Sequence, residues 1–141
     1  MRAARPGRAP AGRASRAIVG IGIDLIEVER METEITRDAE GLRAQTFTPG
    51  EVAHCEGQPH PAAHYAACFA AKEAVLKALA VGVADGASLR EVEIESGRRG
   101  CPRVILHGKA RKAAARLRVH RVILSLSHTR GLAAACVVLE S

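Results

Sequence analysis

Hydrophobic and polar positions along the chain predict five short strands. Residues 17–23 are rich in β-branched side chains and interrupted by glycine, which is typical of a strand with a close backbone neighbour. Alternating runs at 92–95 and 103–107 flank a turn that contains Gly and Pro, and they predict a β-hairpin. Residues 122–127 and 133–139 predict two further strands joined by a turn.

Between the strands the pattern changes to helical periodicity. Residues 62–80 carry apolar and small side chains at helical spacing and predict the longest helix. Residues 27–43 predict an acidic helix, and 108–118 a basic one. Thr48-Pro49-Gly50-Glu51 is a capping-box sequence that predicts the start of another short helix. We therefore expect a single α+β domain, with a small antiparallel sheet packed on a long helix.

The first 16 residues differ from the rest of the chain. They contain five arginines and no acidic residue, together with Ala, Pro and Gly. Such a segment has little to bury, so we expect a disordered leader at 1–16 and a folded domain at 17–141. A transit peptide is the alternative, but the segment has a single serine and few apolar residues.

Charge is distributed unevenly over the predicted domain. The net charge is +6, of which the five leader arginines account for all but +1. Residues 17–96 hold 14 acids and 6 bases, whereas 97–141 hold 10 bases and one acid. This asymmetry indicates a surface that meets an anion, although a basic helix packed beside an acidic one explains it equally well. A nucleic-acid-binding protein is a weaker interpretation, because aromatic residues are scarce and no nucleic-acid motif occurs.

The cysteine content and the hydrophobic runs indicate a cytoplasmic protein. Four cysteines occur without a C-x-x-C pair, and no secretory signal precedes them, so reduced thiols are expected. No apolar run approaches the roughly 20 residues that a membrane-spanning helix requires. We therefore expect no membrane contact.

Asp24 is the first candidate functional residue. It follows the glycine-containing strand, and a carboxylate there suits a hard cation that a phosphate approaches. Considered alone, Asp24 is more typical of a residue that caps the helix after it.

Glu73 and Lys77 form the second candidate pair. They are four residues apart in Phe-Ala-Ala-Lys-Glu-Ala-Val-Leu-Lys and share a helix face. One could hold a metal while the other neutralises phosphate charge. Considered alone, the two residues are more typical of an ordinary surface ion pair.

The third candidate is the segment Ser125-Leu-Ser-His-Thr129 at the end of a predicted strand. Histidine and hydroxyl side chains there can bind phosphate or move protons. A histidine in a turn is otherwise often only solvated.

Together the three segments resemble a known family. Gly-Ile-Asp near residue 24, Phe-Ala-Ala-Lys-Glu-Ala at 69–74 and Ser-x-Ser-His-Thr at 125–129 are similar to the small, holo-acyl-carrier-protein synthase branch of the phosphopantetheinyl transferases. The resemblance covers about residues 18–140. Ile26 stands where larger relatives carry a third acid, which fits the small branch.

The resemblance implies roles for individual residues. Asp24 and Glu73 match two Mg²⁺ ligands, and Lys77 matches a lysine that meets the pyrophosphate of coenzyme A. His128 and Thr129 match the strand end that meets coenzyme A, at its 3′-phosphate.

The resemblance also implies the reaction and the assembly. A serine of apo-acyl carrier protein attacks coenzyme A, phosphopantetheine is transferred, and adenosine 3′,5′-bisphosphate leaves. Either Glu73 or a metal-bound water would accept the serine proton. Arg30, Arg37 and Arg43 would dock the carrier protein, and three subunits would form sites in the clefts between them.

Departures from the family pattern leave alternatives open. Cys68 replaces the usual arginine before Phe-Ala-Ala-Lys-Glu, and the first helix is acidic where the family's is basic. A degenerate homologue that binds coenzyme A without turnover is therefore an alternative. A zinc-binding module is another, because His60, His64 and Cys68 are spaced four apart.

Overall fold

The computed structural model describes residues 16–141, so the predicted leader at 1–16 lies outside the described residues except for Arg16. The order of elements is that of an α+β domain, as the sequence predicts. The elements are β1 (Ile18–Glu27), α1 (Val28–Arg37), α2 (Ala39–Thr46), α3 (Pro49–Glu56), α4 (Pro61–Ala78), β2 (Val92–Ser96), β3 (Pro102–Leu106), α5 (Gly108–Arg116), β4 (Arg121–His128) and β5 (Leu132–Glu140).

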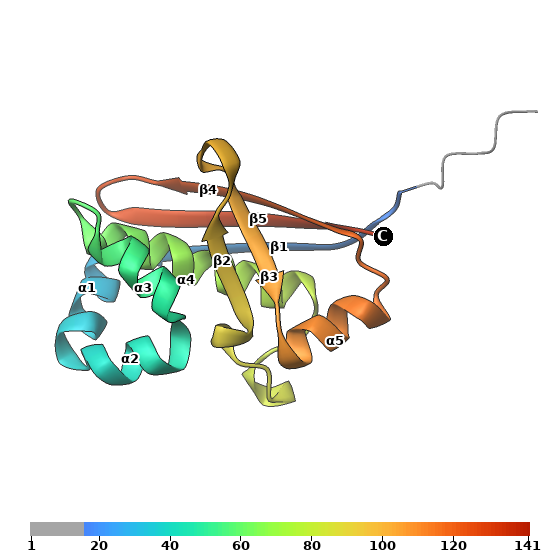
Figure 1. Ribbon diagram of the computed structural model, residues 1–141, viewed down its shortest axis with the longest axis horizontal. Helices are drawn as coiled ribbons and strands as arrows, with labels where there is room; N and C mark the ends of the chain where they lie inside the picture. The colour runs from blue at the N-terminus through green and yellow to red at the C-terminus, as the bar shows by residue number, and fades with distance from the viewer. Residues whose placement is uncertain (1–15) are drawn as a thin grey trace, which may run out of the picture.

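Three strands form an antiparallel sheet in the order β1-β5-β4, and helix α4 lies along one face of it (Figure 1). The β5 side chains that face α4 are almost fully buried; these are Ala133, Ala135, Val137 and Leu139. The predicted sheet on a long helix is confirmed. Strands β2 and β3 pair separately as the predicted hairpin, which lies across α4.

The contact between β1 and α4 depends on two glycines. A Cβ atom at Gly20 would overlap the carbonyl oxygen of Ala78, and one at Gly22 would overlap that of Ala74. Helix α4 contributes small side chains in return, since Ala70 and Ala74 are fully buried. Strand and helix backbones therefore lie closer together than larger side chains would allow.

The structure corrects two expectations near the N-terminus. Strand β1 continues to Glu27, and α1 begins directly after it with Glu27 at its N-cap position, so Asp24 lies inside the strand. The interpretation of Asp24 as a helix cap is therefore wrong. The helix predicted over 27–43 is interrupted at Asp38, whose carboxylate accepts a hydrogen bond from the backbone of Gly41 at 3.1 Å and begins α2.

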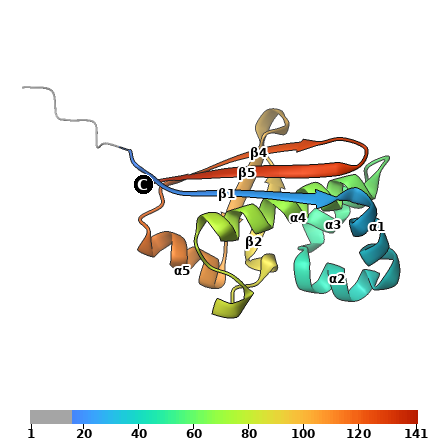
Figure 2. The ribbon, with the colours of Figure 1, turned by 180° about the vertical axis from the view of Figure 1, so that it is seen from behind.

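The acidic and basic helices are not neighbours. Helix α1 lies at one end of the molecule and α5 at the other, as Figures 1 and 2 both show. The idea that the charge asymmetry reflects packing of one against the other is therefore wrong. Across residues 16–141, none of the helices combines the length and apolar character needed to cross a bilayer.

Candidate functional site

Asp24 on β1 and Lys77 on α4 meet where the strand crosses the helix. The Lys77 ammonium donates to Asp24 Oδ1 at 2.7 Å and to the carbonyl oxygen of Ile23 at 3.2 Å. The lysine side chain is 53% exposed and the aspartate 15%. The ion partner of Lys77 among the described residues is thus Asp24, and the predicted surface pair with Glu73 is wrong.

Glu73 lies one helical turn before Lys77 on α4. Its pKa is raised above the ordinary value, first by partial burial and then by the negative charge of Asp24, while the Lys77 ammonium opposes the rise. Two carboxylates therefore share one electrostatic environment in which a further positive charge would be favourable. Oxygen ligands of this kind, few in number, suit Mg²⁺ with a substrate phosphate, so the residues fit the metal that the resemblance implies.

His128 ends β4, and Thr129 follows it in the turn to β5. The Thr129 hydroxyl accepts a hydrogen bond from the Leu132 backbone at 3.2 Å and closes that turn. Strand β5 separates β4 from β1, so His128 lies across the sheet from Asp24. A single chain brings Asp24, Glu73 and Lys77 together but leaves His128 and Thr129 apart from them.

The three arginines proposed for docking lie in different surroundings. Arg30 is exposed on α1. Arg37 is exposed and pairs at 2.7 Å with Glu34, one turn earlier, which is partly buried. Arg43 forms an ion pair with Glu56 of α3. Arg43 is thus already used in holding two helices together.

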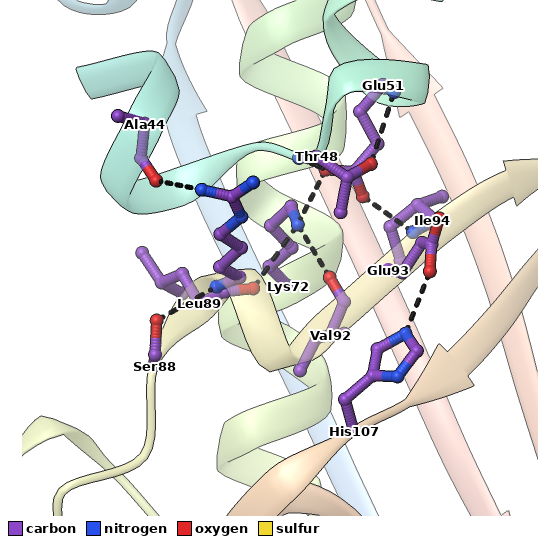
Figure 3. Close-up of polar contacts among 11 residues, drawn as sticks. Ala44, Thr48, Glu51, Lys72, Ser88, Leu89, Val92, Glu93, Ile94 and His107 are labelled. Atoms are coloured by element: carbon purple, nitrogen blue, oxygen red, sulfur yellow. Dashed lines mark hydrogen bonds and ion pairs between the residues drawn. The ribbon is translucent and has the colours of Figure 1, made fainter. Parts of the chain in front are cut away.

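Sequence reasoning missed a buried ion pair in the same motif. Lys72, directly before Glu73, is fully buried and donates to Glu51 Oε2 at 2.8 Å and to the Val92 carbonyl oxygen at 2.6 Å (Figure 3). Glu51 in turn accepts a hydrogen bond from the Ile94 backbone at 2.6 Å. This lysine ties α3, α4 and β2 together.

The side chain of Cys68 is buried beside that ion pair. Burial raises the pKa of its thiol well above the ordinary value, so the thiol is neutral and supplies none of the charge that an arginine would. Among residues 16–141 no three His, Cys, Asp or Glu side chains are grouped to hold a metal ion. His60, His64 and Cys68 are therefore not assembled into the site that the zinc alternative requires.

Comparison with known proteins decides the family. A model of the 4′-phosphopantetheinyl transferase superfamily matches residues 20–137. The chain belongs to this superfamily. A holo-[acyl-carrier-protein] synthase of Moorella thermoacetica is 48% identical over 120 residues, which is 85% of this chain and 92% of that protein. The predicted family is thereby confirmed.

Solved structures of named synthases have the same fold as this chain. The holo-[acyl-carrier-protein] synthase of Neisseria meningitidis superimposes with a TM-score of 0.79 at 28% identity, covering 89% of this chain and all of that one. The enzyme of Helicobacter pylori, solved in complex with coenzyme A, gives a TM-score of 0.74 at 28% identity, covering 84% and 98%. The transferase fold predicted from sequence is confirmed.

Proposed function

We propose that this transferase is a cytoplasmic holo-acyl-carrier-protein synthase. It moves 4′-phosphopantetheine from coenzyme A to a serine of apo-acyl carrier protein and releases adenosine 3′,5′-bisphosphate. The observation that carries the proposal is the meeting of Asp24 and Lys77, from segments 53 residues apart, beside Glu73. The similarity to named synthases supports it, because one of those relatives was solved with coenzyme A bound.

Asp24 and Glu73 would hold Mg²⁺ against the pyrophosphate of coenzyme A. A bound Mg²⁺ neutralises charge on phosphate oxygens and stabilises the charge that develops on the leaving group. Lys77 adds a second positive charge, and its contact with Asp24 orients the ammonium toward that site. The carrier serine oxygen would form a bond to the β-phosphorus as the bond to the adenosine bisphosphate breaks, and Glu73 or a water molecule would accept the serine proton.

The outer face of the sheet supports a homotrimer with sites between subunits. Ile21, Ile23 and Leu25 of β1 are 64–70% exposed, and their register partners on β5 include Val138 and Cys136. A contiguous apolar face of this kind marks an interaction surface. Assembly through it would also let His128 of a neighbouring subunit complete a site that a single chain leaves divided.

The trimer has a direct chemical test. Cys136 is exposed in the single chain but would be covered by a neighbour. We expect slow alkylation of Cys136 in the native protein and fast alkylation in Ile23→Lys, which should also sediment as a monomer. Equal rates in both proteins would contradict assembly through this face. Cys101, exposed in the β2–β3 turn, serves as the reference thiol.

The carrier protein would dock near α1. Arg30 and Arg37 are exposed there and can meet an acidic partner, whereas Arg43 is engaged with Glu56. We therefore expect charge reversal at Arg30 to weaken carrier binding more than charge reversal at Arg43.

The activity test uses apo-acyl carrier protein, coenzyme A and Mg²⁺, with the carrier weighed by intact mass spectrometry. We expect the mass of one phosphopantetheine group to be added, and the addition to be lost with a chelator and in Glu73→Gln. A carrier whose acceptor serine is changed to alanine is the control for the site of transfer. Folded protein that binds coenzyme A but modifies none of several apo-carriers would instead identify the degenerate homologue.

A further inference from the structure

Three imidazole rings from three separate elements form a row on the surface. His54 lies on α3, His64 on α4 and His128 at the end of β4. Ring centroids are 6.0 Å apart between His54 and His64, and 5.6 Å apart between His64 and His128. Within residues 16–141 no carboxylate forms an ion pair with any of the three rings.

The row borders two hollows. All three rings line the first, which has a volume of about 440 Å³ and extends to the β2–β3 turn. His64 and His128 also line the second, together with Thr129. A ligand in either hollow would therefore meet the central ring, that of His64.

Most charged groups facing the first hollow are already paired. Glu51 is bound to the buried Lys72, and Glu95 pairs with Arg103 at 3.3 Å. Arg99 in the β2–β3 turn also lines this hollow and forms no ion pair with the other described residues. The unpaired charged side chain that lines the first hollow, among the described residues, is thus the cation Arg99.

The second hollow is nearly balanced in charge. Arg43 and Glu56 pair with one another, while Glu32 and Arg130 line it with opposite charges and His60 lies at its edge. The other titratable groups around the row are neutral at ordinary pH. Burial raises the pKa values of Cys55 and Tyr65 to about 12 and that of Cys68 well above its ordinary value.

The central ring of the row, His64, gains a proton less readily than an ordinary histidine does. The pKa of His64 is lowered, first by burial and then by the neighbouring imidazoles of His128, His54 and His60. The central ring therefore favours its neutral form while the row is empty. An anion seated against the rings would reverse that preference, because each ring would gain a partner of opposite charge.

We propose that His54 and His64 extend the contact of His128 into a three-ring subsite for the 3′-phosphate of coenzyme A. The inference rests on the proposed function, which assigns the pyrophosphate to Asp24, Glu73 and Lys77 and leaves the phosphomonoester as the other dianion of the substrate. When protonated, the three histidines supply positive charge at the 3′-phosphate, which the neutral Cys68 thiol does not provide. This charge depends on pH.

The sign of the pH effect follows from proton linkage. Binding raises the proton affinity of the row, so protons are taken up on binding and affinity for coenzyme A increases as the pH falls. Uptake of one proton gives at most about a tenfold change per pH unit. A phosphomonoester itself gains a proton near pH 6, which acts in the opposite direction, so the useful range is pH 7.5 to 6.5.

The test is calorimetric titration of the full chain with coenzyme A in Mg²⁺ buffer, without carrier protein, at pH 7.5 and 6.5. For the unaltered protein we expect about fivefold tighter binding at the lower pH. His64→Gln should remove most of that gain, and His54→Gln part of it. His120→Gln, at an exposed histidine outside both hollows, should behave as the unaltered protein does. Dephospho-coenzyme A, which lacks the 3′-phosphate, should show no gain.

Three results would overturn the subsite. They are a full pH gain in folded His64→Gln and His54→Gln, an equal gain with dephospho-coenzyme A, or no binding of coenzyme A at either pH. His54 is exposed, so its variant keeps the test usable if His64→Gln fails to fold. Failure of the proposed function has a different signature, because the pH-dependent binding would persist while no carrier protein is modified.

Discussion

Helix α4 carries two lysines, five residues apart, in contrasting surroundings. Lys72 is fully buried and bonded to a carboxylate and two backbone carbonyl groups, those of Leu89 and Val92. Lys77 is half-exposed and bonded to Asp24 and to the Ile23 carbonyl. Lys72 is therefore part of the buried core, whereas Lys77 faces solvent.

The difference in burial between Lys72 and Lys77 indicates which of the two ammonium groups is available to a ligand. Removing an ammonium from water is costly, so a buried lysine persists only where the protein supplies its partners. Lys72 has all three of its donors engaged within the fold. Lys77 keeps contact with water and can transfer part of its bonding to a phosphate. Stability and activity should therefore depend on different lysines of one motif.

The largest expected effect is on stability, from Lys72→Met. Methionine fills a similar volume but leaves the Glu51 carboxylate, only 2% exposed, without its cation. We expect the free energy of unfolding to fall by about 3–5 kcal/mol, measured by urea denaturation. The double variant Glu51→Gln/Lys72→Met removes both charges and should recover part of the loss.

Lys77→Met is the matched control for that substitution. An exposed ion pair contributes about 0–1 kcal/mol, so the free energy of unfolding should change by no more than that. Equal destabilisation by the two methionine substitutions would contradict the prediction that only Lys72 contributes strongly to stability.

The next effect is on activity, from Asp24→Asn. Loss of this carboxylate removes a proposed metal ligand and the partner of Lys77 together. We expect kcat/KM for transfer to the carrier to fall about a hundredfold, which corresponds to about 2.7 kcal/mol of activation free energy. The unfolding midpoint in urea should stay close to that of the unaltered protein. A folded Asp24→Asn protein with full activity would remove Asp24 from the site.

The smallest effect is on activity in Lys77→Met. The two carboxylates remain, so only one of the positive charges near the leaving group is lost. We expect kcat/KM to fall about tenfold, or about 1.4 kcal/mol. Lys77→Arg keeps the charge and should retain more activity than Lys77→Met in the same assay. If the two variants were equally impaired, charge would not be the property that Lys77 contributes.

Local signals made most of the elements predictable from sequence. The helix predicted over 62–80 corresponds to Pro61–Ala78, and the capping box of Thr48 and Glu51 is present as predicted. The glycine-interrupted strand was expected to have a close backbone neighbour, and the approach to Ala74 provides it. The break at Asp38 was missed because acidic residues continue across it and conceal the second cap.

Contacts over long sequence separations could not be predicted from local patterns. Lys72 and Lys77 occupy similar places in an alanine-rich run, and nothing in the run shows that only the first is buried. The acceptors of Lys72 come from segments 17 to 21 residues away in the sequence, and the Asp24 partner of Lys77 is 53 residues away. The histidine row likewise joins three elements that no single motif connects.

The absence of a side chain at Gly22 allows β1 and α4 to approach closely beside the candidate metal site. Asp24 and Glu73 stand on a strand and a helix whose spacing is limited by backbone contact at Gly22 and Ala74. Backbone atoms have no rotamers to rearrange, so this spacing is stiffer than one set by interlocking side chains. One methyl group added to the strand would push the two elements apart. The absence of a side chain at Gly22 therefore keeps the two backbones that carry Asp24 and Glu73 close together.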